Sequence, residues 1–462
     1  MHKVILDGKA LNVCTDTLLS EVLIKENKDI DHLCGGKGTC KKCLVWVNGK
    51  EELSCQYKIK SDIIVLTQKT GEIISETGAE ETGSLTENLC FALDIGTTTL
   101  ALALVSLDEG KIVGVKTAIN PQRKFGADIM TRIDFCQKNG AKEPHLSLID
   151  QINSMIEDFG SLGAKKMYVA GNATMLHFFY NIDPSSMGAA PYTPVFLEGK
   201  TKDAESIGIK GVKTVESLPS IDAFVGADIV AGLNLVGKPK KAKHSLLIDL
   251  GTNAEIVLFD ENSALCTASA AGPCFEGANI SSGMSATEGA IYLYDNGSFK
   301  TIGDKEPIGI CGTGLVDIMS ELVSNETIDE TGFMEDDFVI TEKVILTKED
   351  IRQYQLAKSA VFSGIMTLLE MKKVSFEDID KMYISGGFSA KINIENAVKT
   401  GLLPKEFKDK CEAIKNSSLL GTVKYACEQN DLESFIEGSK YVDLSANPTF
   451  SDLFIENMMF EI

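Results

Sequence analysis

The chain has 462 residues, 44% of them apolar, which is enough for two or three domains with real hydrophobic cores. Its net charge of −21 argues against nucleic acid as a partner, because phosphate backbones are bound through Lys and Arg. The charge is unevenly placed: residues 1–68 hold ten Lys and nine acidic residues, a balance of +1, so the remainder carries −22. The first segment and the rest of the chain should therefore offer different surfaces to partners.

Targeting and membrane signals are missing from the pattern. The chain opens Met-His-Lys-Val-Ile-Leu-Asp-Gly, which predicts a short strand and a turn rather than a secretory signal, and no run reaches the length of a membrane span. The 12 Cys form no compact disulfide framework, which fits a reducing cytoplasm. We expect a cytoplasmic protein that binds no membrane.

Residues 1–68 predict a small α+β domain. Short apolar runs flank Asp7-Gly8, a hairpin signal, and a helix with one apolar face follows Thr17, its expected N-cap. Cys14 is expected to be a buried strand residue. The order of elements is similar to that of a β-grasp ferredoxin. The expected strands and helix are Val4–Leu6, Ala10–Val13, Leu18–Glu26 (helix), Leu44–Val47 and Ser61–Leu66.

Four cysteines in this domain have the spacing of an iron–sulfur site. Cys34, Cys40, Cys43 and Cys55 read Cys-x5-Cys-x2-Cys-x11-Cys, with glycines at 35, 36 and 38. Glycine adopts the positive φ angles that such a tight loop needs and lets backbone N–H groups approach the sulfurs. The spacing resembles that of [2Fe-2S] ferredoxins of the adrenal and bacterial hydroxylase type. A zinc site is the alternative, although structural zinc usually uses two separated pairs of ligands.

The lysines of the cysteine loop and the acidic segment 69–89 suggest how the iron–sulfur domain could meet its partners. Lys37, Lys41 and Lys42 predict either a docking rim for an acidic electron partner or ordinary solvated side chains. Residues 69–89 contain five Glu and no aromatic residue, which predicts a flexible acidic linker that lets the cluster swing. A linker docked on the body is the alternative.

Residues 90–462 contain an internal repeat. Asp94-Ile-Gly-Thr and Asp249-Leu-Gly-Thr each precede an apolar strand, and each is followed later by a similar strand that ends in glycine, Lys166–Gly171 and Lys381–Gly387. The same signals in the same order predict two similar α/β lobes that face each other across a nucleotide cleft. We place lobe I at about 90–243 and lobe II at about 244–462. This pattern resembles the two-lobed ATPases of the actin, Hsp70 and sugar-kinase type.

The two turns carry chemistry suited to Mg²⁺-ATP. Their glycines allow close backbone approach, and their hydroxyl and N–H groups can cradle phosphate oxygens. Asp94 and Asp249 can hold hydrated Mg²⁺ from opposite lobes. Asp228 resembles the catalytic base of glycerol-kinase-like enzymes and would orient the attacking water, whereas the alternative is an Asp that caps a helix. The phosphate-turn residues are Gly96, Thr97, Thr98, Thr99, Gly251, Thr252 and Asn253, and Gly386, Gly387 and Phe388 form the expected adenosine turn.

A chain of further motifs makes the whole sequence resemble the ATP-dependent reductive activators of corrinoid proteins, in which a ferredoxin is fused to an ATPase body. The motifs are Asp94 to Thr99, Asn120-Pro-Gln with Phe125-Gly-Ala-Asp128, Gly171-Asn-Ala-Thr-Met175, Ala190-Pro-Tyr192, Asp249 to Glu255, Ala271 to Gly277, Gly309 to Gly314 and Ser385 to Phe388. The resemblance adds Glu276, Gly312 and Gly314 to the ATP site. It implies one-electron reduction of cobalt(II) to cobalt(I) in the corrinoid protein of a methyltransferase system, coupled to ATP, with a low-potential electron donor.

The sequence differs from the family pattern at several places, and it is also compatible with other functions. Larger members carry an extra domain between ferredoxin and ATPase, where this chain has only residues 69–89, and Ala254 stands where the family often has Gly. Cys274 and Cys311 are expected to be packing residues. The alternatives are a small-molecule kinase with a redox-sensing ferredoxin, an activator of a non-corrinoid enzyme, and a non-enzymatic scaffold. The corrinoid partner, the electron donor and a homodimeric state are left open.

Overall fold

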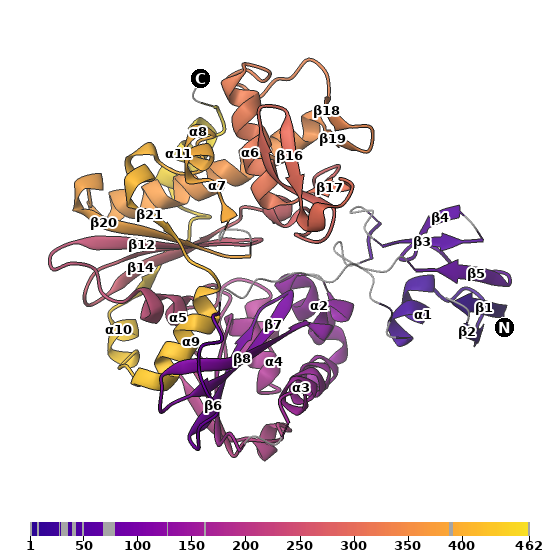
Figure 1. Cartoon of the computed structure of the whole chain (residues 1–462), viewed down its shortest axis with the longest axis horizontal. Coiled ribbons are helices and arrows are strands. Elements are labelled where there is room, and N and C mark those ends of the chain that lie inside the picture. Colours follow the sequence, from indigo (N-terminus) through magenta and orange to yellow (C-terminus); the bar gives the residue numbers. More distant parts are fainter. Residues whose placement is uncertain are drawn as a thin grey trace.

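The structure is a computed structural model with an N-terminal module and two lobes, each lobe built on a six-stranded sheet (Figure 1). Among the residues it describes, no helix is both long and apolar enough to cross a membrane. It describes residues 2–6, 9–26, 28, 36–38, 43–48, 50–67, 79–126, 128–160, 163–387 and 391–460.

The N-terminal module is a five-stranded mixed sheet that packs against one helix. The sheet order β2-β1-β5-β3-β4 sets the first and last strands of the module parallel to each other, as in a β-grasp domain. Alternate side chains of these strands, such as Val4, Leu6 and Val65, pack with Leu19 and Leu23 of the helix in one small core. The elements are β1 (His2–Leu6), β2 (Lys9–Val13), α1 (Leu19–Lys25), β3 (Leu44–Val47), β4 (Lys50–Leu53) and β5 (Ile63–Leu66).

Two expectations for this module were wrong. Thr17 is not the N-cap of α1: Leu18 takes that position without a side-chain cap, because the backbone of Thr17 and Leu19 pairs with residues 57–59 instead. Cys14 is exposed rather than buried, since it follows the end of β2, the edge strand of the sheet. The strand β4 has the polar sequence Lys-Glu-Glu-Leu and was not predicted.

The internal repeat corresponds to two sheets that share the same topology over five strands, whereas the sixth strand, β10 in lobe I and β22 in lobe II, is added at opposite edges. In lobe I the hairpin β6–β7 is antiparallel and β9 joins β6 in parallel, whereas in lobe II the hairpin is β12–β13 and β20 joins β12 in parallel. The sheet orders are β10-β11-β9-β6-β7-β8 and β21-β20-β12-β13-β14-β22. The prediction of two similar α/β lobes is therefore confirmed.

The main elements of lobe I are β6 (Leu89–Ile95), β7 (Thr99–Ser106), β8 (Lys111–Ile119), α2 (Ile129–Asn139), α3 (Lys142–Glu157), β9 (Lys166–Gly171), α4 (Ala173–Phe179), β10 (Lys200–Asp203), β11 (Thr214–Ser217) and α5 (Ala227–Val236). Those that follow are β12 (His244–Leu250), β13 (Ala254–Phe259), β14 (Ala264–Ser269), β15 (Ala290–Asp295), β16 (Ser298–Thr301), β17 (Gly309–Ile310), α6 (Gly312–Ser324), β18 (Phe338–Thr341), β19 (Val344–Leu346), α7 (Lys348–Lys372), β20 (Ile379–Ser385), α8 (Ile394–Lys399), β21 (Cys411–Ala413), α9 (Ser417–Glu428), α10 (Glu433–Glu437), β22 (Lys440–Tyr441) and α11 (Pro448–Glu456).

Two helices form the layer between the sheets. α9 packs its Leu419 and Val423 against the inner face of the lobe I sheet, although it lies late in the sequence. α5 packs its Ile229 and Leu233 against the inner face of the lobe II sheet. The two helices also pack against each other, so the order of layers is sheet, α9, α5, sheet (Figure 1). A division of the chain at residue 243 therefore does not separate the lobes completely.

The described part of the expected linker is held on lobe I. Gly83 N donates to Ile112 O at 2.8 Å, and Glu81 Oε1 accepts from Val115 N at 2.8 Å, both at the edge strand β8. Thr86 and Ser106 share a hydrogen bond of 2.9 Å. Residues 79–88 thus follow the docked alternative rather than the flexible one, whereas residues 69–78 lie outside the described residues.

Candidate functional site

Strand alternation aims the two expected Mg²⁺ carboxylates at the same layer. In β6, Phe91, Leu93 and Ile95 face the outer core of lobe I, so Asp94 faces the inner side with Cys90 and Ala92. In β12, Leu246, Ile248 and Leu250 likewise face the outer core of lobe II, and Asp249 faces inward. Because successive strand residues point to opposite faces, both carboxylates reach the layer that holds α5 and α9.

The first phosphate turn is held by three polar side chains, of which Asn120 and Arg132 are buried and Asn172 is partly exposed. Asn120 Nδ2 donates to Gly96 O at 2.8 Å, and Arg132, which is fully buried in α2, donates to Thr97 O at 2.7 Å and to Gly126 O at 2.8 Å. Asn172 Nδ2 donates to Thr97 Oγ1 at 3.1 Å. The separate motifs around residues 120, 126 and 172 therefore converge on this one turn.

Asp228 lies in the first turn of α5, next to the same region. Gly226, not Asp228, is the N-cap, and a Cβ on Gly226 would stand 2.4 Å from Asn172 Cα. Asp228 Oδ1 accepts from Ile229 N at 2.9 Å. The backbone of the Gly-Ala-Asp segment can approach the start of α4 this closely because Gly226 has no side chain.

Asp94, Asp228, Asp249 and Glu255 form a carboxylate cluster. Glu255 was not among the expected site residues, but it pairs directly with Asp249 across the β12–β13 hairpin. The corresponding pair in lobe I is Asp94 with Ala101, so only lobe II adds a second carboxylate. The sequence motif Asp249 to Glu255 contained this signal, since residues on either side of a tight hairpin face each other.

The cluster has strongly perturbed acidities. Withdrawal from water, together with the charges of Asp249 and Asp94, raises the pKa of Asp228 to about 7. Withdrawal from water also raises the pKa of Asp94 and of Asp249 to about 6, although hydrogen bonds from Ser418 and Ser385 respectively oppose the rise. The pKa of Glu255 is raised for the same reason, with Asp249 the strongest neighbouring charge. Mutually repelling carboxylates of this kind favour a bound cation.

The N-terminus of α9 contacts both lobes at the cluster, which sequence analysis missed. Ser418 Oγ donates to Asp94 Oδ1 at 2.7 Å, and Ser417 Oγ shares a 2.6 Å hydrogen bond with Ser385 Oγ of lobe II. Asn416 caps the helix through Leu419 N. Only tertiary contact reveals these residues, because they lie more than 300 positions after Asp94.

The other described residues of the expected ATP site lie at the second turn, beside β12 and at the start of α6. Glu276 lies at the second turn, where its Oε2 accepts from Thr252 Oγ1 at 2.7 Å. Gly386, with φ +114, crosses so close to β12 that a Cβ would stand 2.1 Å from Leu250 O, and Gly387 is unobstructed. Gly312 and Gly314 open α6, where a Cβ on Gly314 would stand 2.2 Å from Ile291 O. Phe388 lies outside the described residues.

The two described cysteines of the cluster motif are adjacent. Cys43 and Cys55 are buried, and their sulfurs are 3.2 Å apart. Gly36 and Gly38 have φ angles of +82 and +75, as a tight cluster loop requires. Two sulfurs held this close fit a site for an iron–sulfur cluster. Cys34 and Cys40 lie outside the described residues.

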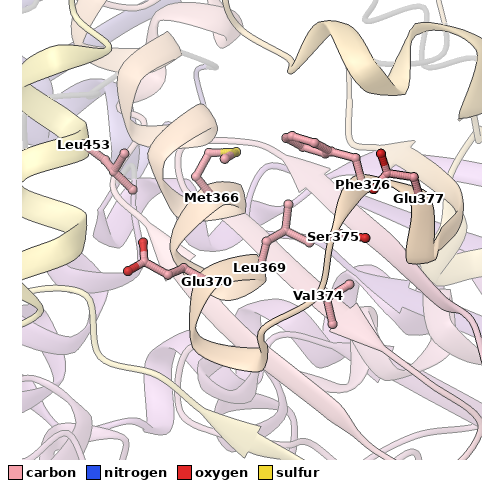
Figure 2. A pocket seen from close by; sticks show the side chains of 8 residues that line it. All are labelled: Met366, Leu369, Glu370, Val374, Ser375, Phe376, Glu377 and Leu453. Atoms are coloured by element: carbon pink, nitrogen blue, oxygen red, sulfur yellow. The ribbon is translucent and has the colours of Figure 1, made fainter.

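A separate hollow of about 250 Å³ opens on lobe II between the end of α7 and α11 (Figure 2). Apolar side chains line most of it, including Met366, Leu369 and Phe376, with Glu370 and Glu377 at its rim. It is smaller than ordinary ligand pockets and lies on the α7 side of the sheet, opposite to the face that carries Asp249. We therefore keep the nucleotide site at the carboxylate cluster.

Comparison with known proteins identifies the family. Residues 89–239 match the family model described as the RACo middle region, and residues 243–462 match the model described as the C-terminal domain of RACo, the ASKHA domain. The chain belongs to the RACo family. The ASKHA class contains the actin and sugar-kinase type of ATPase, so the fold expected for the body is confirmed.

Relatives of the RACo family match the chain over most of its length. A solved structure of a reductive activator for corrinoid, iron–sulfur protein covers 100% of this chain and 98% of its own, with 27% identity and a TM-score of 0.72. The corrinoid activation enzyme RamQ of Eubacterium limosum is 26% identical over 97% of each chain. A Co(II) methylated amine-specific corrinoid protein reductase of Methanosarcina barkeri is 26% identical over 79% of this chain and 75% of its own.

The donor set fits Mg²⁺ held through water. Among the described residues, no three His, Cys, Asp or Glu side chains come close enough together to bind an ion directly. Mg²⁺ keeps several waters and usually takes one or two carboxylates plus the phosphates of its nucleotide. Asp94 and Asp249, which interact across the lobes, satisfy that description.

Proposed function

We propose that this chain is an ATP-dependent reductive activator of a corrinoid protein, which reduces cobalt(II) to cobalt(I) by one electron. The observation that carries the proposal is the end-to-end match with the structure of a reductive activator, which spans the cysteine module and both lobes together. The adjacent sulfurs of Cys43 and Cys55 support the electron-transfer part of the reaction, and the carboxylate cluster supports the ATP-dependent part. The corrinoid protein belongs to a methyltransferase system.

The body binds and hydrolyses ATP in this proposal. Asp94 and Asp249 hold hydrated Mg²⁺ between the lobes, and the turns at 96–99 and 251–253 cradle the phosphates. Asp228 orients the attacking water and accepts its proton. Its raised pKa, about 7, suits a general base that works near neutral pH. Ser385, which shares a hydrogen bond with Ser417 of α9, directly precedes Gly386 of the expected adenosine turn.

The N-terminal module carries the electron. Cys34, Cys40, Cys43 and Cys55 would hold a [2Fe-2S] cluster, which supplies one-electron transfer from a low-potential donor. Clusters of the plant type have potentials near about −400 mV, and each further ~59 mV of shortfall costs a tenfold factor in a one-electron equilibrium. ATP binding or hydrolysis supplies the difference by changing the surface that the two lobes offer to the corrinoid protein.

The α9 helix could transmit the effect of ATP binding from one lobe to the other. Its first turn contacts Asp94 of lobe I and Ser385 of lobe II, and its body packs on the lobe I sheet. With Mg²⁺-ATP bound, Asp94 and Asp249 would repel each other less, so the two turns could approach each other. The lobes would then close about the α5–α9 layer.

The test follows a cobalt(II) corrinoid protein by visible absorbance under anaerobic conditions, with a low-potential reductant and the reconstituted protein. Cobalt(I) should appear with Mg²⁺-ATP and not without it. The variant Asp94→Asn should abolish the ATP effect and keep the cluster spectrum, whereas Cys55→Ser should keep ATP hydrolysis and abolish the reduction.

Two outcomes would overturn the proposal. One is that ATP leaves every tested corrinoid protein in the cobalt(II) state while the wild-type protein holds its cluster. The other is steady ATP consumption on a sugar or a carboxylic acid, which would make the chain a small-molecule kinase with a redox module.

A further inference from the structure

One side chain connects the cysteine loop with the turn that carries the fourth cysteine. Gln56 directly follows Cys55, and its Nε2 donates to Gly36 O at 2.6 Å. Gly36 belongs to the loop between Cys34 and Cys40. The same Nε2 lies 3.7 Å from Cys55 Sγ, within the range of a hydrogen bond to sulfur. Because a glutamine amide has two N–H groups, it can make both contacts at once.

The turn that holds Gln56 is itself well anchored. Gln56 N donates to Leu53 O at 2.9 Å, Ser54 N donates to Cys43 O at 2.9 Å, and Ser20 N of α1 donates to Ser54 O at 3.0 Å. The backbone around Cys55 is therefore tied to both β3 and α1. Because the backbone of Gln56 is held in place, its side-chain amide can hold Gly36 and the cysteine loop in a defined position.

The loop also packs against the stem of Gln56. A Cβ on Gly38 would stand 2.9 Å from Gln56 Cγ and 3.2 Å from Gln56 Cδ, so only glycine allows this approach. The contacts at Gly36 and Gly38 lie on both sides of Lys37. Gln56, which is exposed, thus contacts the described part of the loop between the first two cysteines, residues 36–38.

We propose that Gln56 is a positioning residue for the iron–sulfur cluster. One N–H of its side-chain amide holds the cysteine loop at Gly36, and the other donates to the Cys55 sulfur. The inference rests on the proposed function, since it requires the cluster. A donor to a ligand sulfur stabilises the reduced cluster, which has one more negative charge, and so raises its reduction potential. Retention of the cluster and its potential therefore depend on the same side chain.

Two variants separate charge from hydrogen bonding. Gln56→Met keeps the length of the side chain and removes both donors, and Gln56→Glu is nearly isosteric but adds a negative charge beside the sulfur. The matched control is Asn12→Asp, which adds the same charge to β2, at the opposite edge of the sheet from β4. All are made in the full-length chain, with the cluster reconstituted.

The measurements are a redox titration followed by electron paramagnetic resonance and the half-life of the cluster in a ferrous chelator. Gln56→Met should lower the potential and shorten the half-life several-fold, Gln56→Glu should lower the potential further, and Asn12→Asp should match the wild type. If the Gln56 variants alone lose the cluster completely while the circular dichroism of the polypeptide is unchanged, the result also supports the inference, because it is a stronger form of the expected loss of cluster retention.

Unchanged potential and half-life in both Gln56 variants would overturn the inference. That result leaves the proposed function intact if the wild-type protein still reduces cobalt(II) with ATP. A wild-type protein that takes up no [2Fe-2S] cluster on reconstitution would instead remove the proposed function, and the inference with it.

Discussion

At the scale of single residues, the site is governed by the burial of its carboxylates and, next to that, by the repulsion among them. Asp228, Asp94 and Asp249 have raised pKa values mainly because they are withdrawn from water. The charge of Asp249 adds to the rise at Asp94 and Asp228, and that of Glu276 adds to the rise at Asp249, so ionising these groups costs free energy. The local hydrogen bond from Ser418 only partly offsets this effect at Asp94. In the proposed function, bound Mg²⁺-nucleotide would offset this cost, so ligand binding would change the electrostatic energy of the cluster.

The pH dependence of stability follows from these shifts. Raised carboxyl pKa values contribute stability that is fully present below the ordinary value of 3.8 and is lost as pH rises through about 6 to 7. We expect Asp228→Asn to raise the free energy of unfolding of the nucleotide-free protein at pH 8 by about 1 kcal/mol, and to leave it nearly unchanged at pH 4. Urea unfolding at the two pH values measures this.

The same variant should lose most ATP hydrolysis. The control Asp336→Asn removes an exposed carboxylate that precedes β18, and it should change neither stability nor hydrolysis. Equal stability of Asp228→Asn and wild type at pH 8 would show that the cluster is not repulsive.

Buried Arg132 allows a second prediction at this scale. It donates to the carbonyls of Thr97 and Gly126, and Arg132→Met leaves both without that donor. We expect a loss of about 2–4 kcal/mol in the free energy of unfolding and at least a tenfold weaker affinity for Mg²⁺-ATP, because the first phosphate turn loses its brace. Isothermal titration and urea unfolding measure the two effects.

Arg352→Met is the matched control, because Arg352 is exposed on α7 and donates only weakly to Gln355 at 3.3 Å. An Arg132→Met protein that binds nucleotide as tightly as wild type would contradict the bracing role.

At the scale of elements, the crossing of α5 and α9 decides how the lobes meet. Gly421 in the middle of α9 lies against the backbone of α5, where a Cβ would stand 1.8 Å from Ala231 O. Asn234 Nδ2 of α5 donates to Gly421 O at 3.0 Å, which fixes the crossing further. Because each helix also packs on a different sheet, any change in their separation moves one lobe relative to the other.

Gly421→Ala tests this crossing. In an ordinary helix this substitution is favourable by about 1 kcal/mol. Here we expect a loss of roughly 3 kcal/mol, or a measurable separation of the lobes, because the added methyl group meets backbone that cannot rotate away. Gly232→Ala on α5 is the control, since its nearest neighbour is the flexible end of Leu247 at 3.0 Å. Thermal unfolding that ranks the two variants equally would reject the argument.

At the scale of the whole molecule, the body and the N-terminal module have separate cores. The module core is built from residues between Val4 and Val65, whereas every core cluster of the lobes is built from residues 79 onward. Residues 79–88 belong with the body, because their hydrogen bonds go to β8, to the turn before it and to Ser106 at the end of β7. The charge follows the same division, since nearly all of the excess of acidic residues lies outside residues 1–68.

A fragment of residues 79–462 should therefore fold and hydrolyse ATP alone. We expect its thermal unfolding and basal hydrolysis to lie close to those of the full chain, and its reduction of a cobalt(II) corrinoid protein to be lost completely. Full-length Cys55→Ser, which keeps the module without a competent cluster, should show the same pair of results. Aggregation or loss of hydrolysis in the fragment alone would show that the module stabilises the lobes.

The sequence by itself determined the features that depend on local pattern. The hairpins at 94–101 and 249–255 and the later parallel strands were predictable, because strand alternation, tight Gly turns and an internal repeat are local signals. The spacing of the cysteines predicted the adjacency of Cys43 and Cys55 for the same reason. The places where sequence reasoning failed, such as the cap of α1 and the exposure of Cys14, are positions where neighbouring strands override local preference.

Only the tertiary structure decided which distant residues complete the site. Ser417 and Ser418 reach Ser385 and Asp94 because α9 returns to the lobe I sheet after the chain has built lobe II, and nothing local to α9 encodes that return. Arg132 and Asn120 support the first turn through helix and loop packing, and Glu255 joins the cluster through its cross-strand register with Asp249. Such contacts arise when layers pack together, so their physical basis is the burial of whole faces rather than the preference of any single segment.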